Sequence, residues 1–142
     1  MIVLDASFLV KLVLEENGSE NARNLARSWA KGGETLATID LALPEALNAI
    51  WKHSLRIGDL ERDEAINSAR DLLRIWATLR VYPSKEIAEE AFKLALEEDI
   101  TVYDALYIQL AKSLRAGLAT FDEKLSKIAA NHGITTYPLK PI

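Results

Sequence analysis

The sequence predicts an α/β fold in which a parallel sheet is covered by helices on both faces. Short apolar runs alternate with longer segments of helical periodicity, which is typical of strand–helix units that build a parallel sheet. The chain has 142 residues, of which 49% are hydrophobic and 27% are charged. This size and composition suit one domain with a core of its own. We therefore expect a single three-layer domain over residues 1–142, with five strands.

The first part of the chain predicts two strands and two helices. Ile2–Leu4 is a short apolar run and indicates a buried strand. Ala6–Leu14 is apolar on nearly all sides and should form a deeply buried helix. Ser19–Lys31 carries its apolar residues on one helical face and ends at Gly32. Leu36–Ile39 is the second predicted strand.

The middle of the chain predicts two helices and one strand. Proline is favoured in the first turn of a helix, which indicates a helix over Pro44–Ile57 that ends at Gly58. Glu61–Trp76 has apolar residues at helical spacing. Leu79–Tyr82 is the third predicted strand, and Pro83 closes it.

The last part of the chain predicts three helices and two strands. Ser84 is a candidate N-cap for a helix that runs to Glu98. A further helix begins at Thr101, runs to about Arg115 and stops at Gly117. The remaining elements, in chain order, are a strand, a helix and a strand over Leu118–Phe121, Glu123–Asn131 and Ile134–Tyr137.

The composition narrows the chemistry and the compartment. The chain contains no cysteine, which excludes thiol chemistry, disulfides, iron–sulfur clusters and cysteine-ligated zinc. No apolar run approaches the roughly 18 residues of a membrane helix. The apolar start Met1–Leu4 is interrupted by Asp5 and lacks the basic segment of a signal peptide. We therefore expect a cytoplasmic protein.

The net charge of −4, from 17 basic and 21 acidic residues, argues at first against a nucleic-acid partner, because phosphate contacts require positive charge. That argument assumes that the acids are spread over the surface. If four acids belong to a metal site, the remaining 17 balance the 17 basic residues. A nucleic-acid substrate therefore stays open.

Four acidic residues fall at the ends of predicted elements. Asp5 and Asp122 directly follow strands, while Glu45 and Asp104 lie in the first turns of helices. Each has an ordinary alternative role, because acids cap helices and interact favourably with the helix dipole. Asp104 also follows Thr101 at the spacing of a capping box. In open α/β sheets, however, ligands bind beyond the carboxyl ends of the strands.

These acids would repel one another strongly if they converged. One pair at ~4 Å costs roughly 4 kcal/mol at an effective dielectric constant of ~20. Such a cluster persists only with bound cations or with shifted protonation. Oxygen ligands select hard ions such as Mg²⁺ or Mn²⁺ and not zinc.

The motifs around these acids resemble those of a known family. Val3–Ser7, Pro44–Asn48, Tyr103–Tyr107 and Thr120–Asp122 are similar to the four motifs of PIN domains. More narrowly, the chain resembles VapC toxins of prokaryotic VapBC toxin–antitoxin pairs. The resemblance covers the whole chain in length, element order and motif order.

The resemblance implies a five-stranded parallel sheet and a ribonuclease that uses one or two Mg²⁺ or Mn²⁺ ions. Its acidic quartet falls on Asp5, Glu45, Asp104 and Asp122, as catalytic residues and metal ligands, with Asp5 and Asp104 as the principal ligands. Its small hydroxyl residues orient a carboxylate or a metal-bound water. The residues expected in this orienting role are Ser7, Thr120 and Asn48, and for Asn48 the alternative is a plain surface amide.

Other chemistries fit less well. His53 and His132 are the only histidines, and neither follows a predicted strand, so paired-histidine catalysis is not indicated. His132 is expected at the C-terminal end of a helix, and His53 half-buried or exposed within one. Ser7 lacks the Gly-x-Ser-x-Gly context of a nucleophile, and no glycine-rich phosphate loop follows the first strand. Lys11 and Lys52 are the candidates for RNA contact, since they lie on helices that leave the acidic site.

The tryptophans predict packing more than base stacking. Trp29, Trp51 and Trp76 all lie in predicted helices, where such residues are usually buried. Stacking on unpaired bases is the alternative role for each.

The resemblance also implies partners, namely a small antitoxin and a second copy of the chain in a homodimer. Two alternatives remain: a PIN-domain nuclease of RNA maturation without an antitoxin, and a non-catalytic α/β interaction domain that binds metal. A receiver-like domain is disfavoured, because Tyr82–Pro83 ends the third strand where a phosphoacceptor aspartate would be needed.

Overall fold

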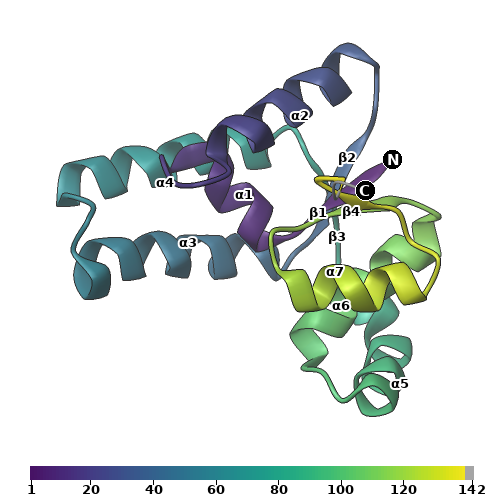
Figure 1. Cartoon of the computed structure of the whole chain (residues 1–142). Coiled ribbons are helices and arrows are strands. Elements are labelled where there is room, and N and C mark those ends of the chain that lie inside the picture. The colour runs from purple at the N-terminus through teal and green to yellow at the C-terminus, as the bar shows by residue number, and fades with distance from the viewer. Residues whose placement is uncertain (140–142) are drawn as a thin grey trace.

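The computed structural model describes residues 1–139 and contains a five-stranded sheet in which all strands are parallel. The order across the sheet is β3-β2-β1-β4-β5, so the first strand is central (Figure 1). The predicted α/β fold class and strand number are therefore confirmed. The strands are β1 (Ile2–Leu4), β2 (Leu36–Ile39), β3 (Arg80–Tyr82), β4 (Gly117–Ala119) and β5 (Thr136–Tyr137).

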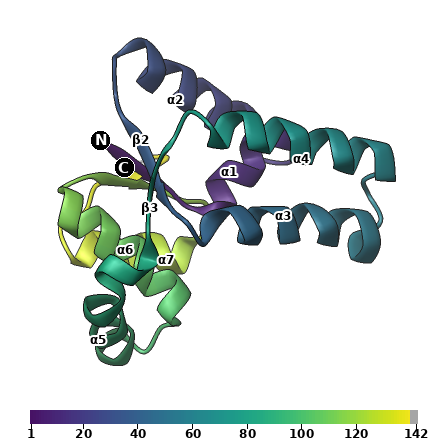
Figure 2. The same cartoon turned by 180° about the vertical axis from the view of Figure 1, so that it is seen from behind.

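The helices form two groups with the sheet between them, which gives the expected three layers. Figures 1 and 2 show α1 to α4 gathered on one side of the sheet and α5 to α7 on the other. No helix within residues 1–139 is long and apolar enough to cross a membrane. The helices are α1 (Ala6–Val13), α2 (Ser19–Lys31), α3 (Ala42–Lys52), α4 (Arg62–Trp76), α5 (Ala88–Glu98), α6 (Val102–Leu114) and α7 (Glu123–Asn131).

The core lies at the centre of these layers. In β1, Val3 and Leu4 are fully buried, and the buried face of α1 begins directly after them with Phe8 and Leu9. The strong burial of α1 confirms the prediction made from its nearly continuous apolar pattern. It also fixes Asp5, between β1 and α1, at the carboxyl edge of the sheet.

The helix predicted over Pro44–Ile57 is two elements. α3 begins two residues earlier, at Ala42, and gives way after Lys52 to a π-helical turn over His53–Ile57. Gly58 ends this turn at φ 77°, a left-handed conformation that glycine adopts without strain. A π-helical turn is wider than an α-helical turn, so the residues after it lie on a different face. The spacing of apolar side chains does not reveal this change.

The N-cap role predicted for Ser84 is wrong. Ser84 opens a 3-10 turn (Ser84–Ile87), and α5 begins only after it, with Ile87 at the N-cap position. The backbone N–H of Ser84 donates to Asp40 Oδ2 at 3.1 Å, and its hydroxyl group lies 3.4 Å from the same atom. Asp40 follows β2, so this contact ties the end of one strand to the turn after the next.

The glycine expected to stop α6 belongs instead to the sheet. Gly117 opens β4, and Arg115 ends the helix in the left-handed conformation at φ 51°. A Cβ atom at Gly117 would lie 2.8 Å from the ring of Tyr137 and 3.2 Å from the carbonyl oxygen of Thr135. Gly117 is therefore required by the close approach of β5.

Two of the three tryptophans pack as expected. Trp29 contacts Phe8 and Tyr137, with ring centroids 5.6 and 5.3 Å apart, and Trp76 packs partly buried against the core. Trp51 differs, because 42% of its surface is exposed. The guanidinium of Arg56 lies 4.7 Å from its ring centroid, so a cation–π contact covers part of this side chain.

Candidate active site

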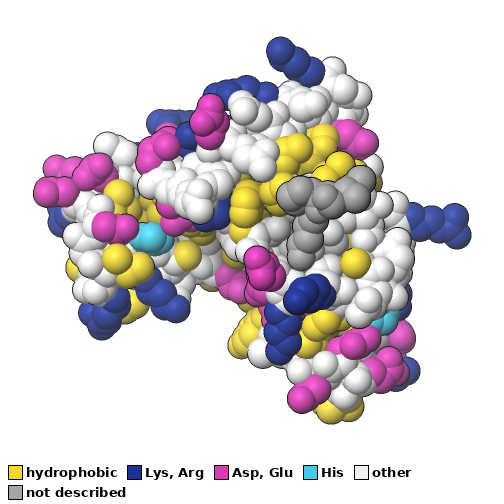
Figure 3. All heavy atoms as spheres, in the orientation of Figure 1, with side chains coloured by type: hydrophobic (Ala, Val, Ile, Leu, Met, Phe, Trp, Pro, Cys, Tyr) yellow, Lys and Arg dark blue, Asp and Glu magenta, His cyan; other side chains and the backbone are white. Residues whose placement is uncertain are grey.

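The acidic residues lie around the carboxyl ends of the central strands. Asp5 follows β1 and donates its backbone N–H to Ala119 O of β4, at 3.1 Å. Thr120 and Asp122 follow β4 within three residues. The pairing of β1 with β4 therefore brings two segments, more than 110 positions apart, to one edge of the sheet. Figure 3 shows acidic side chains in the hollow between the two helix groups.

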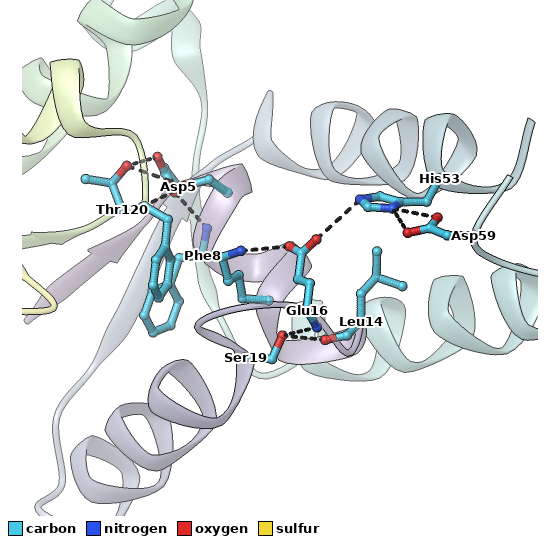
Figure 4. A network of polar contacts seen from close by, with 11 residues as sticks. Asp5, Phe8, Leu14, Glu16, Ser19, His53, Asp59 and Thr120 are labelled. Carbon is cyan, nitrogen blue, oxygen red and sulfur yellow. Dashed lines mark hydrogen bonds and ion pairs between the residues drawn. The ribbon is translucent and has the colours of Figure 1, made fainter. Parts of the chain in front are cut away.

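Asp5 is buried, with 4% of its surface exposed, and three groups donate to its carboxylate (Figure 4). Oδ1 accepts from the Ser7 hydroxyl group at 2.7 Å and from the Phe8 N–H at 2.9 Å, while Oδ2 accepts from the Thr120 hydroxyl group. A carboxylate offers about four lone-pair directions. One direction on Oδ2 therefore remains available to a further ligand.

Burial, and to a smaller extent the charge of Asp122, raises the pKa of Asp5 from 3.8 to about 6. The hydrogen bonds from Thr120, Ser7 and Phe8 act in the opposite direction, because they stabilise the ionised form. A bound cation would also favour the ionised form. Asp5 is therefore a buried carboxylate whose ionised form is stabilised by three hydrogen bonds and would be stabilised further by a bound cation.

Ser7 and Thr120 join the two segments of this edge. Their hydroxyl oxygens lie 3.4 Å apart. Ser7 Oγ accepts the Phe121 N–H at 2.9 Å, and Thr120 Oγ1 accepts the Asp122 N–H at 3.0 Å. Each hydroxyl group thus donates to Asp5 and accepts from the backbone of the β4–α7 loop, which fixes the carboxylate and that loop together.

The helix-capping roles weighed for Asp5 and Asp122 are present as well, whereas Asp104 forms only half of a capping box. Asp5 caps α1, and Asp122 caps α7 by accepting the Leu125 N–H at 3.1 Å. Thr101 caps α6 by accepting the N–H of Asp104 at 3.2 Å. Capping and ion binding are compatible, because a cap occupies only one lone-pair direction of a carboxylate.

Glu45 and Asp104 extend the acidic region toward α3 and α6. Burial raises the pKa of Glu45, as does the charge of Asp104. Burial likewise raises the pKa of Asp104, followed by the charge of Asp122, while Lys124 opposes this. The charge of Asp122 therefore raises the pKa of both Asp5 and Asp104, and the charge of Asp104 raises that of Glu45. All four carboxylates are linked by electrostatic repulsion.

Tyr107 is a site residue that the sequence did not reveal. Its hydroxyl group donates to Glu45 Oε1 at 2.7 Å and accepts the backbone N–H of Ala6, the residue after Asp5. Burial and the neighbouring Glu45 raise its pKa far above the usual value, so it stays a donor. The available signal is its spacing, because a residue three positions after Asp104 lies on the same helical face.

The carboxylates suit a hard divalent cation in chemistry, although they do not form a closed cage. Among residues 1–139, no three Asp, Glu or His side chains form a group that could hold an ion as they stand. All four acids nevertheless offer oxygen ligands, which Mg²⁺ and Mn²⁺ prefer. Mg²⁺ usually keeps several waters and binds through one or two carboxylates plus substrate phosphate. A loose set of acids with mutually raised pKa values fits that mode.

The remaining predicted site residues lie on α1 and α3. Asn48 and Lys52 are exposed, one and two turns beyond Glu45. Lys11 is half-buried, pairs with Glu16 Oε1 at 3.0 Å, and lies 5.2 Å from the ring centroid of Phe121. The structure thus gives Lys11 a partner within the protein and leaves Asn48 and Lys52 facing solvent.

A groove of about 420 Å³ leads from the acidic region along α1 and α3. It brings in His53, whose half-buried position matches the expectation, together with Glu16, which the sequence did not single out. His132 lies elsewhere, at the C-cap of α7, where its Nε2 is 2.6 Å from Glu98 Oε1. The side chains of the groove include those of Ser7, Lys11, Glu16, Glu45, His53 and Phe121.

Comparison with known proteins gives concordant matches. A family model described as "PIN domain" matches residues 2–131. Ribonuclease VapC3 of Pyrobaculum aerophilum is 37% identical over 126 residues, which is 89% of this chain and 92% of the relative. Exonuclease VapC9 of the same organism is 33% identical over 97 residues, or 68% and 69% of the two chains.

Solved structures share the fold. A crystal structure of a Pyrobaculum aerophilum protein gives a TM-score of 0.70 at 30% identity, covering 95% of this chain and 82% of that one. A toxin–antitoxin complex from Klebsiella pneumoniae gives a TM-score of 0.65 at 16% identity, covering 89% and 90%. The second likeness is one of fold alone.

Proposed function

The chain belongs to the PIN-domain family, and from this premise we propose that it is a metal-dependent endoribonuclease that hydrolyses phosphodiester bonds in RNA. One observation of the structure carries the proposal. Four carboxylates share one edge of the sheet, and their charges and burial raise the pKa values of three of them. Such an arrangement is costly for a protein that binds no cation there.

The proposed ligands follow from burial and position. Asp5 and Asp104 are the principal ligands of Mg²⁺ or Mn²⁺, and Glu45 and Asp122 bind directly or through water. A divalent cation held there would supply water activation and neutralise charge at the reacting phosphate.

The chain's own residues do the positioning. Ser7 and Thr120 hold the carboxylate of Asp5 at one orientation, and Tyr107 holds that of Glu45. Because Asp5 has a pKa of about 6, part of its population carries a proton near neutral pH when no cation is bound. Loading the site therefore displaces that proton, and affinity for the cation rises with pH.

The test is cleavage of mixed RNAs in Mg²⁺, in Mn²⁺ or in EDTA. Asp71→Asn is the matched control for Asp5→Asn, because Asp71 is an exposed carboxylate on α4 paired with Arg74. We expect cleavage by wild type and control with either ion, and none by Asp5→Asn or in EDTA. Products should carry 5′ phosphate and 3′ hydroxyl ends, since water is the attacking group. Full activity in EDTA, or cyclic phosphate ends, would contradict the mechanism.

An exonuclease is the second candidate, because a relative at 33% identity carries that name. The chemistry at the phosphate is the same, and the two activities differ in whether a free RNA end is needed. A circular RNA separates them. Cleavage of the circle supports the endonuclease, whereas degradation of only the linear form assigns the exonuclease.

We further propose that the protein is the toxin of a two-protein module and works in the cytoplasm. The motifs that resemble those of VapC toxins, together with the similarity to relatives named VapC3 and VapC9, support a small antitoxin partner. The negative edge of the sheet suits a partner segment that carries arginine, whose guanidinium pairs bidentately with carboxylates. A co-purified partner should lose inhibition when its arginines are changed to alanine. Inhibition that survives this change at low salt assigns blockage to apolar contact, and a protein without any such partner fits RNA maturation.

A homodimer completes the proposal. Large apolar side chains are exposed on the α5–α6 hairpin, including Phe92 (54%), Leu96 (70%) and Tyr103 (60%). Apolar surface gathered in this way is typical of an interface. Sedimentation at micromolar concentration should give twice the chain mass of 15.8 kDa. A single-chain mass would refute the dimer.

A further inference from the structure

Lys11 is the lysine of the groove beside the acidic site, and the fold holds it from several sides. Its ammonium group lies 5.2 Å from the ring centroid of Phe121. Gly18 of the α1–α2 loop approaches so closely that a Cβ there would lie 3.3 and 3.4 Å from Lys11 Cδ and Cε. The same Cβ would lie 2.9 Å from the Phe121 ring. The aromatic ring and the loop therefore place the ammonium group independently of any ion pair.

Glu16 places a carboxylate against this ammonium group. Its Oε1 is 3.0 Å from Lys11 Nζ, and its Oε2 is 3.3 Å from His53 Nε2 (Figure 4). The Glu16 backbone N–H donates to Ser19 Oγ at 3.0 Å, and the Ser19 hydroxyl group donates to Leu14 O at 2.6 Å. The carboxylate is thus anchored between two groups that can carry positive charge.

His53 faces carboxylates through both ring nitrogens. Its Nδ1 lies 2.9 and 3.1 Å from the two oxygens of Asp59, and its Nε2 faces Glu16. The imidazole donates to both acids only when both nitrogens carry hydrogen. His53 is the first residue of the π-helical turn and lines the groove, and π-helical turns are frequent at functional sites.

We propose that Lys11 and His53 form a binding site for an RNA phosphate next to the one cleaved, and that Glu16 occupies this site in the free protein. This inference rests on the proposed ribonuclease function. A phosphate group has the charge and the oxygen atoms to replace the Glu16 carboxylate between the two nitrogen groups. The site opens into the groove that also contains Ser7 and Glu45. An RNA strand in the groove would therefore place one phosphate here and its neighbour at the acidic residues.

The competing role for Glu16 is to position Lys11 for RNA. The structure argues against it, because Phe121 and Gly18 already hold the lysine stem. Because Lys11 does not need Glu16 to hold it in place, the main effect of Glu16 is to neutralise the charge of Lys11 and to repel phosphate. The two roles predict opposite changes in RNA affinity when the charge of Glu16 is removed.

The experiment measures binding of a fluorescently labelled single-stranded RNA by anisotropy in EDTA, where cleavage is absent. Glu16→Gln should lower Kd by roughly twofold to fivefold, the range expected for one partly exposed ion pair. Glu15→Gln is the matched control, because Glu15 is the adjacent acid, is 83% exposed and pairs with Arg23 outside the groove. It should leave Kd nearly unchanged.

Lys11→Gln should raise Kd and lower the slope of log Kd against log salt by about 0.7, the value for one phosphate contact on a single strand. His53→Gln should also raise Kd. In a background that carries both Lys11→Gln and His53→Gln, the gain from Glu16→Gln should largely disappear, because both groups that Glu16 faces are then gone. A general effect of removing negative charge would persist there, and that result would overturn the proposal.

The outcomes separate the two levels of inference. Weaker RNA binding by Glu16→Gln overturns the competition between Glu16 and phosphate, since it assigns Glu16 to positioning. Unchanged binding by Lys11→Gln, in a protein that still cleaves RNA, overturns the phosphate site alone. A wild-type protein that neither binds nor cleaves RNA refutes the proposed function together with this inference.

Discussion

Replacing Asp5 by asparagine should stabilise the metal-free protein, although it abolishes the proposed activity. Burial raises the pKa of Asp5 from 3.8 to about 6, so the folded state keeps its proton to higher pH than the unfolded state. The protonated carboxyl group therefore favours the folded state. This contribution to the free energy of unfolding is fully present below about pH 4 and is lost as the pH rises through 6. At 1.36 kcal/mol for each pKa unit, the ionised carboxylate lowers the free energy of unfolding by about 3 kcal/mol at pH 8.

Asparagine removes this cost and keeps most of the contacts. It caps helices about as well as aspartate, so α1 retains its N-cap. Its carbonyl oxygen can accept from Ser7 and Phe8 as Oδ1 does now. The Thr120 hydroxyl group must turn from donor to acceptor, which reduces the gain. We expect a net increase of about 1–3 kcal/mol in the free energy of unfolding at pH 8.

The assay is urea unfolding in EDTA at pH 8 and at pH 4 for wild type, Asp5→Asn and the exposed control Asp71→Asn. The advantage of Asp5→Asn should shrink at pH 4, because the wild-type carboxyl group is then largely neutral. Saturating Mn²⁺ should reverse the order at pH 8 by stabilising only the wild type and the control. A loss of 1 kcal/mol or more in Asp5→Asn at pH 8 in EDTA would refute the reasoning and assign Asp5 a purely structural role.

Substitutions at three further residues test the same edge of the sheet. Asp104→Asn should abolish cleavage and leave the metal-free protein equally or more stable, since it relieves repulsion; a loss of several kcal/mol in thermal unfolding would make Asp104 a structural residue. Thr120→Val should lower the free energy of unfolding by about 1–3 kcal/mol, because the N–H of Asp122 loses its acceptor, while Thr120→Ser should behave as wild type. Tyr107→Phe should weaken Mn²⁺ binding measured by calorimetry and raise the pKa of Glu45, whose ionised form the hydroxyl group stabilises. Unchanged Mn²⁺ affinity would show that Tyr107 only supports packing.

The fold was predictable because its signals are local. β1, β2 and β4 are short, largely apolar runs, and the helices show apolar residues at helical spacing. The errors occur where a distant segment decides the local structure. Gly117 is required by the ring of Tyr137, and Ser84 is held by Asp40 across 44 positions. The π-helical turn after Lys52 leaves the apolar pattern of α3 unchanged, so it could not be predicted from the sequence.

The site residues that directly follow a strand could be predicted from the sequence. Asp5 and Asp122 stand directly after β1 and β4, so parallel pairing alone brings them to one edge. The bond between Tyr107 and Glu45 spans 62 positions and depends on how α6 packs beside α3. The ion pair of Lys11 with Glu16 depends on the course of the α1–α2 loop. Contacts of this kind require the packed structure.

The two outer strands limit self-association through the sheet and restrict the ways in which a partner can bind. β3 has three residues and β5 has two, and each is followed directly by a proline, Pro83 and Pro138. Proline supplies no N–H to a neighbouring strand, and short outer strands offer little backbone for templated addition. Fibril growth by strand stacking is thereby disfavoured at both borders. A partner that extends the sheet would find equally few hydrogen bonds, so recognition of this protein should proceed through its helices and the groove between them.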